Sequence, residues 1–153
     1  SKGLVGSEMC IRDRYYHATI NNSIVVGTGN KVEDFGIGFY TKYGDGGVDI
    51  SPIADLMKSE IFEISKELKI NKEILEAKPT DGLWDDDRTD EDQIGASYDD
   101  LERVMNSLEN GVSPEKFDDK TREDFNIYIK HHNANKHKMK SIPICKIPIE
   151  LKS

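Results

Sequence analysis

Cysteine, aromatic residues and long apolar runs are all scarce in this chain of 153 residues. Two cysteines are too few for a disulfide framework or a four-thiolate zinc site, so we expect a reducing, cytoplasmic setting. No apolar run approaches the roughly 18 residues of a membrane helix, and we expect no membrane-spanning segment. The 29 acidic residues outnumber the 21 basic ones, which argues against binding to a nucleic-acid backbone.

The length fits one domain or a piece of a larger one. Residues 3–14 resemble a translated sequencing-adapter fragment, so we expect residues 1–14 to be a non-native leader. Residues 15–145 would then form part of a single domain, and residues 146–153 would form a tail.

The β-branched run Ile24-Val25-Val26 stops at Gly27 and predicts a short strand that is buried on both faces, as in a parallel sheet. Six glycines follow within residues 29–51 and predict a shaped binding loop, with a long surface connection as the alternative. Open α/β sheets bind ligands at the carboxyl ends of their strands. Thr28 is therefore a candidate nucleotide contact, although a threonine that merely ends a strand fits the same pattern.

Ser51 and Pro52 form a cap and first-turn pair, and the apolar residues within 53–68 recur at spacings of 4, 4, 3 and 4. This pattern predicts an amphipathic helix. Residues 77–95 are polar and turn-prone, which predicts a loop or lid.

Two further helices are predicted in the second half of the chain. One begins with Ser97 as its cap and stops at Gly111, and the next begins at Ser113-Pro114 and runs to about His132. A buried strand followed by these helices predicts a helix-rich α/β fold.

Charged residues of both signs surround the glycines. Glu33 is a candidate Mg²⁺ ligand, because Mg²⁺ binds one or two carboxylates together with phosphate oxygens and water. Lys42, Asp45, Asp49 and Lys58 are candidates for gripping phosphates and a polar organic group. Ordinary solvated surface charges explain the same pattern.

Two apparent metal motifs are set aside. The acidic residues at 85–87 and 90–92 lack the residue order of an EF-hand, so a solvated acidic lid is the better interpretation. His131, His132 and His137 match no zinc-binding spacing.

Residues 25–34 and 38–50, the latter containing Thr-Lys-Tyr-Gly-Asp-Gly, closely resemble the NAD synthetase family of ATP pyrophosphatases. The resemblance extends over residues 15–145 and includes Pro52, Lys58, Pro79-Thr80, Asp90-Glu91 and His137-Lys138. It implies the C-terminal part of a Rossmann-like, parallel-sheet nucleotide-binding fold. The implied reaction is the ATP-dependent amidation of nicotinic acid adenine dinucleotide (deamido-NAD) by ammonia, through an acyl-adenylate.

The resemblance also implies roles for individual residues. ATP would be contacted by Thr28, Lys58 and Thr80, of which Lys58 and Thr80 would also stabilise charge on the adenylated intermediate. Asp45 would position or deprotonate ammonia, and Glu33 would bind Mg²⁺. The implied ligands of deamido-NAD are Lys42, Asp49, His137 and Lys138.

The family's Ser-Gly-Gly-x-Asp-Ser loop, which cradles the pyrophosphate of ATP, has no match in this sequence. We therefore expect a C-terminal fragment that is inactive alone and that belongs to a homodimer when complete. A related ATP pyrophosphatase that amidates or thiolates another substrate is one alternative. A non-catalytic module that binds a nucleotide or a partner chain is the other.

Overall fold

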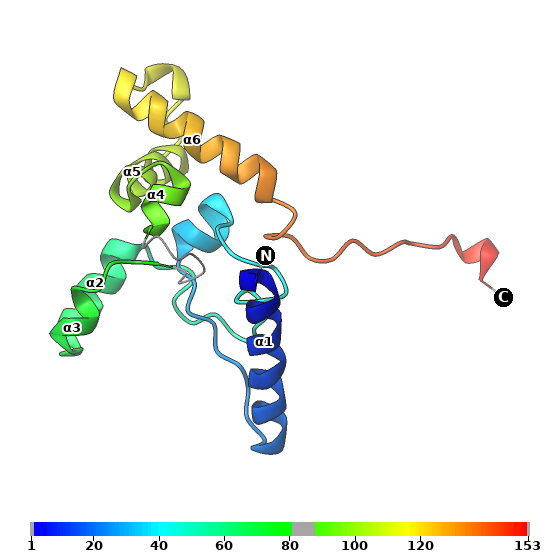
Figure 1. The fold of residues 1–153 in the computed structure, drawn as a ribbon. Helices are drawn as coiled ribbons and strands as arrows, with labels where there is room; N and C mark the ends of the chain where they lie inside the picture. Colours follow the sequence, from blue (N-terminus) through cyan, green and yellow to red (C-terminus); the bar gives the residue numbers. More distant parts are fainter. Residues whose placement is uncertain (1, 81–87, 153) are drawn as a thin grey trace.

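The structure is a computed structural model that describes residues 2–80 and 88–152. Figure 1 shows a helical body, from which a long first helix, a two-helix arm and an extended tail project in three directions. None of the described helices is long and apolar enough to cross a membrane. The helical elements are, in chain order, α1 (Lys2–Ile20), η1 (Val32–Ile37), α2 (Lys58–Glu67), α3 (Lys72–Leu75), α4 (Asp90–Ile94), α5 (Tyr98–Glu109), η2 (Pro114–Lys116), α6 (Asp119–Asn135) and η3 (Ile149–Leu151).

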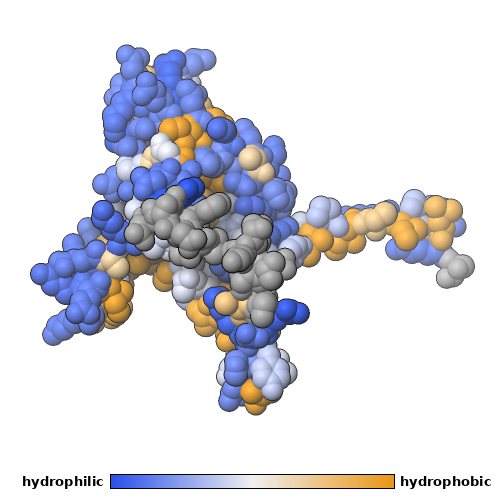
Figure 2. Space-filling view, viewed as in Figure 1, coloured by the Kyte–Doolittle hydropathy of each residue, from blue (hydrophilic) through white to orange (hydrophobic). Residues whose placement is uncertain are grey.

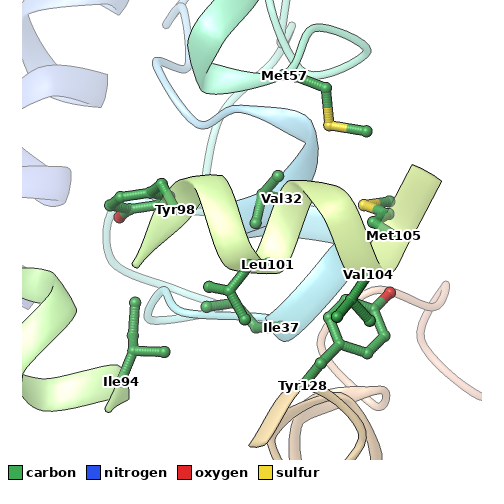
Figure 3. Close-up of a cluster of buried hydrophobic side chains, with 9 residues drawn as sticks. All are labelled: Val32, Ile37, Met57, Ile94, Tyr98, Leu101, Val104, Met105 and Tyr128. Carbon is green, nitrogen blue, oxygen red and sulfur yellow. The ribbon is translucent and has the colours of Figure 1, made fainter. Parts of the chain in front are cut away.

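Helix α5 lies at the centre of the hydrophobic core. Its apolar residues recur at helical spacing, so Leu101, Val104 and Met105 share one buried face. That face packs against η1 and α6, as Figure 3 shows for Val32, Ile37 and Tyr128. The cluster is completed by Met57, Ile94 and Tyr98.

The caps of α5 confirm its predicted bounds. The Ser97 side chain accepts a hydrogen bond from the backbone N–H of Asp100, which satisfies one of the unpaired donors at the start of the helix. At the other end Gly111 adopts a φ of 73°, a left-handed conformation that glycine reaches without steric cost.

The third predicted helix does not begin at Ser113-Pro114. Those residues introduce the short 3₁₀ turn η2, after which Phe117 is extended. Asp118 provides a second cap by accepting from the N–H of Thr121, and α6 starts there and ends three residues beyond His132. The prediction merged two elements because Ser113-Pro114 has the sequence of a helix start, although the Ser113 side chain makes no capping hydrogen bond.

The first predicted helix also begins later than expected. Residues 52–55 form a turn, Met57 is extended, and α2 starts at Lys58, where the Glu60 carboxylate accepts from the N–H of Met57 at 2.7 Å. Much of the predicted apolar face is exposed, with Ile64 at 43% and Leu68 at 69%. Apolar side chains are visible along this arm in Figure 2.

In place of the predicted strand the described residues contain one isolated parallel bridge, between Val26 and Ile50. It is supported by a hydrogen bond of 2.7 Å from the N–H of Gly27 to the carbonyl of Ile50. Val25 is buried, but Ile24 and Val26 are 59% and 50% exposed. Burial on both faces is therefore wrong for these two, because no described segment covers their outer side.

The glycine-rich zone is not a loop throughout, because residues 32–37 form the π-helical turn η1. Residues five apart share a face in a π-helix, so Val32 and Ile37 are both buried against α5. The Asn30 side chain accepts from the N–H of Glu33 at the start, and Gly38 ends the turn with a φ of 64°.

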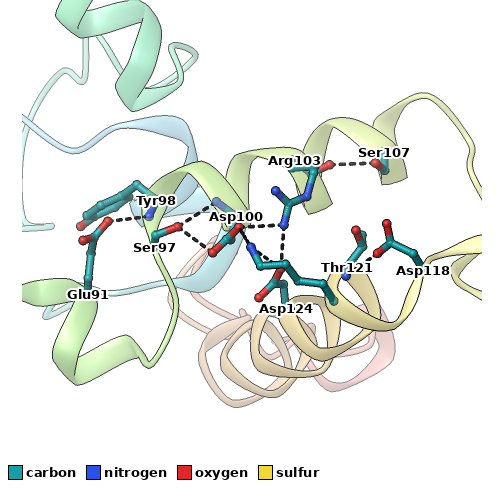
Figure 4. Close-up of polar contacts among 10 residues, drawn as sticks. Glu91, Ser97, Tyr98, Asp100, Arg103, Ser107, Asp118, Thr121 and Asp124 are labelled. Carbon is teal, nitrogen blue, oxygen red and sulfur yellow. Dashed lines mark hydrogen bonds and ion pairs between the residues drawn. The ribbon is translucent and has the colours of Figure 1, made fainter.

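A charged network joins α5 to α6 (Figure 4). The Asp100 carboxylate accepts from Arg103 at 2.7 Å and from Lys120 at 2.6 Å, and Arg103 also donates to Asp124 at 2.7 Å. Hydrogen bonds from Lys120, Ser97 and Arg103 lower the pKa of Asp100 to about 2.

We predict that Leu101→Ala destabilises the fold by about 3 kcal/mol, because it leaves a cavity where α5 meets η1 and α6. Leu68→Ala, at an exposed position of the α2–α3 arm, is the matched control and is expected to change the free energy of unfolding by less than about 0.5 kcal/mol. Urea denaturation followed by circular dichroism measures both. Equal effects would show that α5 is not the centre of the core.

We predict that Asp100→Asn destabilises the fold by on the order of 1 kcal/mol at about pH 6. Arg103 and Lys120 would lose their ion pairs with the Asp100 carboxylate, and the effect is modest because the network lies mostly at the surface. The folded-state pKa lies below the unfolded value of about 3.9, so this contribution is present above pH 3.9 and disappears as pH falls towards 2. Denaturation of both proteins over this range measures it. A difference that stays constant with pH would contradict the assigned network.

Candidate functional site

A cavity of about 260 Å³ lies at the end of the short parallel bridge. Its walls come from the glycine-containing segment at 27–29, from η1 and the loop after it, and from the residues after α6. Among the predicted site residues it is lined by Thr28, Glu33, Asp45 and Lys138.

Lys58, the first residue of α2, reaches this cavity through Glu33. Its ammonium nitrogen lies 2.7 Å from Oε1 of Glu33 and 3.8 Å from the centre of the Tyr98 ring. Both charged side chains are only 18% exposed, so water screens the pair weakly. The structure thus brings together Lys58 and Glu33, which are 25 residues apart in the sequence.

Asp34 forms part of the cavity wall beside Glu33, and sequence analysis did not select it. Its carboxylate lies so close to Gly29 that a side chain at that position would collide with it. Burial raises the pKa of Asp34 to about 6, and the negative charges of Glu33 and Asp45 contribute. Its position next to the predicted metal ligand Glu33 was the available sequence signal.

Asp45 is exposed, and its carboxylate accepts a hydrogen bond of 2.8 Å from the N–H of Thr41. It therefore stabilises the turn of its own loop while facing the cavity. Together with Glu33 and Asp34 it gives the cavity three carboxylates.

Lys42 and Lys138 join the loop after η1 to the residues that follow α6. Lys138 donates to the carbonyls of Gly38 and Tyr40 at 3.0 and 2.7 Å, and Lys42 donates to the carbonyl of His137 at 3.1 Å. Burial lowers the pKa of Lys138. The structure thus brings together Lys42, His137 and Lys138, three of the four predicted dinucleotide contacts. The ammonium groups of both lysines donate to backbone carbonyls.

Asp49 and Thr80 do not line the cavity. Asp49 accepts from the N–H of Val25 at 2.8 Å and from the hydroxyl of Tyr15 at 3.2 Å, so it fixes the bridge region. Thr80 is exposed and donates to the carbonyl of Arg88 at 3.3 Å. Of the predicted lid, residues 81–87 lie outside the described residues, and they include the acidic run at 85–87.

Three histidines lie within hydrogen-bond distance of backbone carbonyls. Ring nitrogens of His131, His132 and His137 lie 3.1, 2.7 and 3.2 Å from the carbonyls of Ile94, Gly36 and Ala134. Within residues 2–80 and 88–152, no group of three or more histidine, cysteine, aspartate or glutamate side chains is arranged to hold a metal ion.

Glycine backbone, a threonine hydroxyl and a lysine line the cavity together with its carboxylates. Backbone N–H groups, hydroxyls and cations are groups with which enzymes bind phosphate-bearing nucleotides. A model of the family described as NAD synthase matches residues 7–142. The chain belongs to the NAD synthase family.

Curated relatives carry the name NH(3)-dependent NAD(+) synthetase. The protein from Methanosarcina mazei is 42% identical over 133 residues, which cover 85% of this chain and 51% of the relative. That from Alkaliphilus oremlandii is 42% identical over 126 residues, or 82% of this chain and 46% of the relative. The chain spans about half the length of the curated relatives it matches.

Two solved structures superpose on most of this chain. The NMN synthetase from Francisella tularensis superposes with a TM-score of 0.77 at 34% identity, over 95% of this chain and 56% of its own. The NH3-dependent NAD synthetase from Campylobacter jejuni, in complex with nitrate, superposes with a TM-score of 0.64 at 26% identity. The match covers 93% of this chain and 54% of that protein's chain. The family assignment made from residues 25–50 is confirmed.

We predict that Gly38→Ala destabilises the fold by at least about 1 kcal/mol more than Gly111→Ala does. Both positions have a positive φ, so both substitutions carry the same backbone strain. A Cβ at Gly38 would lie 2.5 Å from Cβ of Asn135, whereas Gly111 has open space around it. Equal losses in thermal or urea denaturation would show that the loop is not packed on α6 at this point.

Proposed function

We propose that this chain carries the substrate-binding half of an NAD synthetase, which converts deamido-NAD to NAD⁺ with ATP and ammonia. The observation that carries the proposal is the Lys58–Glu33 pair beside the cavity that Thr28 lines, in a chain of this family. We further propose that the bridge between Val26 and Ile50 is part of a parallel sheet in the complete protein.

The reaction needs activation, because a carboxylate is a poor electrophile. The nicotinate carboxylate attacks the α-phosphorus of ATP and pyrophosphate leaves, and ammonia then attacks the acyl carbon and AMP leaves. Negative charge accumulates on the phosphates, so fixed cations close to them lower the barrier. We assign this role to Lys58, whose ammonium group is held by the cavity-lining Glu33, with Thr28 and Thr80 as further ATP contacts.

The described residues fit a Mg²⁺ ion held by one protein ligand, Glu33, because Mg²⁺ keeps several waters and takes its other ligands from phosphates. The largely buried Glu33 carboxylate faces the cavity from η1. Bound there, the ion would neutralise phosphate charge. Lys58 holds Glu33 oriented in the structure as it stands.

We propose that deamido-NAD binds to the neighbouring surface formed by Lys42, His137 and Lys138. Asp49 would support this surface by holding the backbone of the bridge region. Both lysines donate to neutral carbonyls, which an anionic dinucleotide can replace as a partner. Asp45, which lines the cavity, is assigned the role of positioning or deprotonating ammonia. A cytoplasmic homodimer is the proposed state of the complete enzyme.

The proposal is tested by NAD⁺ formation from deamido-NAD, ATP, Mg²⁺ and ammonia. We predict that the chain alone is inactive and that a protein joining it to the N-terminal half of a homologous synthetase is active. In that joined protein Lys58→Ala should abolish ATP–pyrophosphate exchange, whereas Lys66→Ala, on an exposed part of α2, should not.

The outcomes separate the alternatives. Turnover by the 153 residues alone would show that a second half is unnecessary. Amidation of GMP instead of deamido-NAD would identify a related ATP pyrophosphatase. Tight dinucleotide binding by this chain, with no release of AMP from the joined protein, would support a non-catalytic module.

A further inference from the structure

Helix α5 presents two buried polar residues towards the start of α2, and neither has a role in the proposed chemistry. Tyr98 and Glu102 are 5% and 7% exposed. They are four residues apart, so they lie one above the other on one face of α5. Lys58 is the first residue of the helix that this face meets.

Glu102 binds the first turn of α2. One carboxylate oxygen accepts from the N–H of Ser59 at 3.0 Å, and the other accepts from its hydroxyl at 2.6 Å. A carboxylate at a helix N-terminus satisfies an unpaired N–H and complements the positive end of the helix dipole. Glu102 thus caps α2 directly after Lys58, from a different helix.

Tyr98 lies beneath the Lys58 ammonium group, which is 3.8 Å from the centre of the ring. The face of an aromatic ring attracts a cation, and more strongly where water is excluded. The backbone N–H of Tyr98 donates to the Glu91 carboxylate at 2.8 Å, which fixes the first turn of α5 (Figure 4). Its ring belongs to the same core cluster as Leu101 (Figure 3).

We infer that Tyr98 and Glu102 are positioning residues, through which α5 fixes the place of the Lys58 ammonium group against Glu33 at the wall of the cavity. Glu102 sets where α2 begins, and Tyr98 holds the lysine side chain against Glu33. A catalytic role for this arrangement rests on the proposed function. The positioning of Lys58 by Tyr98 and Glu102 is independent of that function, so the two are tested separately.

The experiment measures how fast an amine-reactive ester labels Lys58 in the 153-residue chain, with Lys66 of the same helix as the internal reference. Peptide mass spectrometry gives the ratio of the two rates, which a general loosening of α2 would leave unchanged. Tyr98→Leu should raise the Lys58/Lys66 ratio roughly threefold to tenfold, because the lysine loses its aromatic partner. Tyr98→Phe keeps the ring and should leave the ratio unchanged.

Glu102→Ala should raise the ratio as well, and Glu102→Gln, which keeps an oxygen acceptor for the N–H of Ser59, should restore most of the wild-type value. Ser59 is exposed, so Ser59→Ala removes one hydrogen bond to Glu102 with little risk to folding. We expect about a twofold rise for Ser59→Ala, and none for the control Ser65→Ala.

An unchanged ratio in Tyr98→Leu overturns the role of Tyr98, and an unchanged ratio in both Glu102→Ala and Ser59→Ala overturns that of Glu102. If Tyr98→Leu does not fold, a raised ratio in Tyr98→Phe decides against the ring as the support. In a separate measurement, Mg²⁺-ATP is added to the joined protein, which carries both halves of the proposed ATP site. Failure of ATP to slow labelling of Lys58 counts against the proposed function and leaves the positioning role standing.

Discussion

The burial of α5 between η1 and α6 is the contact on which the other features of this protein depend. Leu101 and Val104 are fully buried there, together with Val32 and Ile37 at the two ends of η1. Because those two residues are fixed, the carboxylates between them in the sequence are held at the cavity instead of moving with a loop. The apolar core thus sets the geometry of a polar site.

The N-terminal half of α5 also contacts the start of α2, where Lys58 lies. Its first two turns carry Tyr98 and Glu102, which contact Lys58 and the residue after it. Lys58 is thereby held beside the cavity, paired with the cavity-lining Glu33 and shielded from water on one side by an aromatic ring. A ligand that brings phosphate groups would meet a cation whose position is already fixed, which reduces the reorganisation that its binding requires.

Local signals predicted those elements that are governed by local interactions. Ser97 and Gly111 bounded α5 correctly, since a cap and a left-handed glycine act within one turn. Cap residues also misled, because Ser51-Pro52 and Ser113-Pro114 precede turns, and the helices that follow begin at Lys58 and Asp119. At the start of α2 the local contact of Glu60 with Met57 is joined by one from Glu102, 43 residues away from Ser59 in the sequence, which no local pattern reveals.

The sequence by itself determined the family, through the run of residues 25–50, and it selected Thr28, Glu33, Asp45, Lys58 and Lys138 as residues of one site. Only the tertiary structure decided that Asp34 shares the cavity with a raised pKa, that Lys42 and Lys138 join two segments, and that Asp49 bonds to the backbone of the bridge region. The physical reason is that residue type specifies which bonds a side chain can form. Burial and the partners brought by distant segments decide which of those bonds it forms.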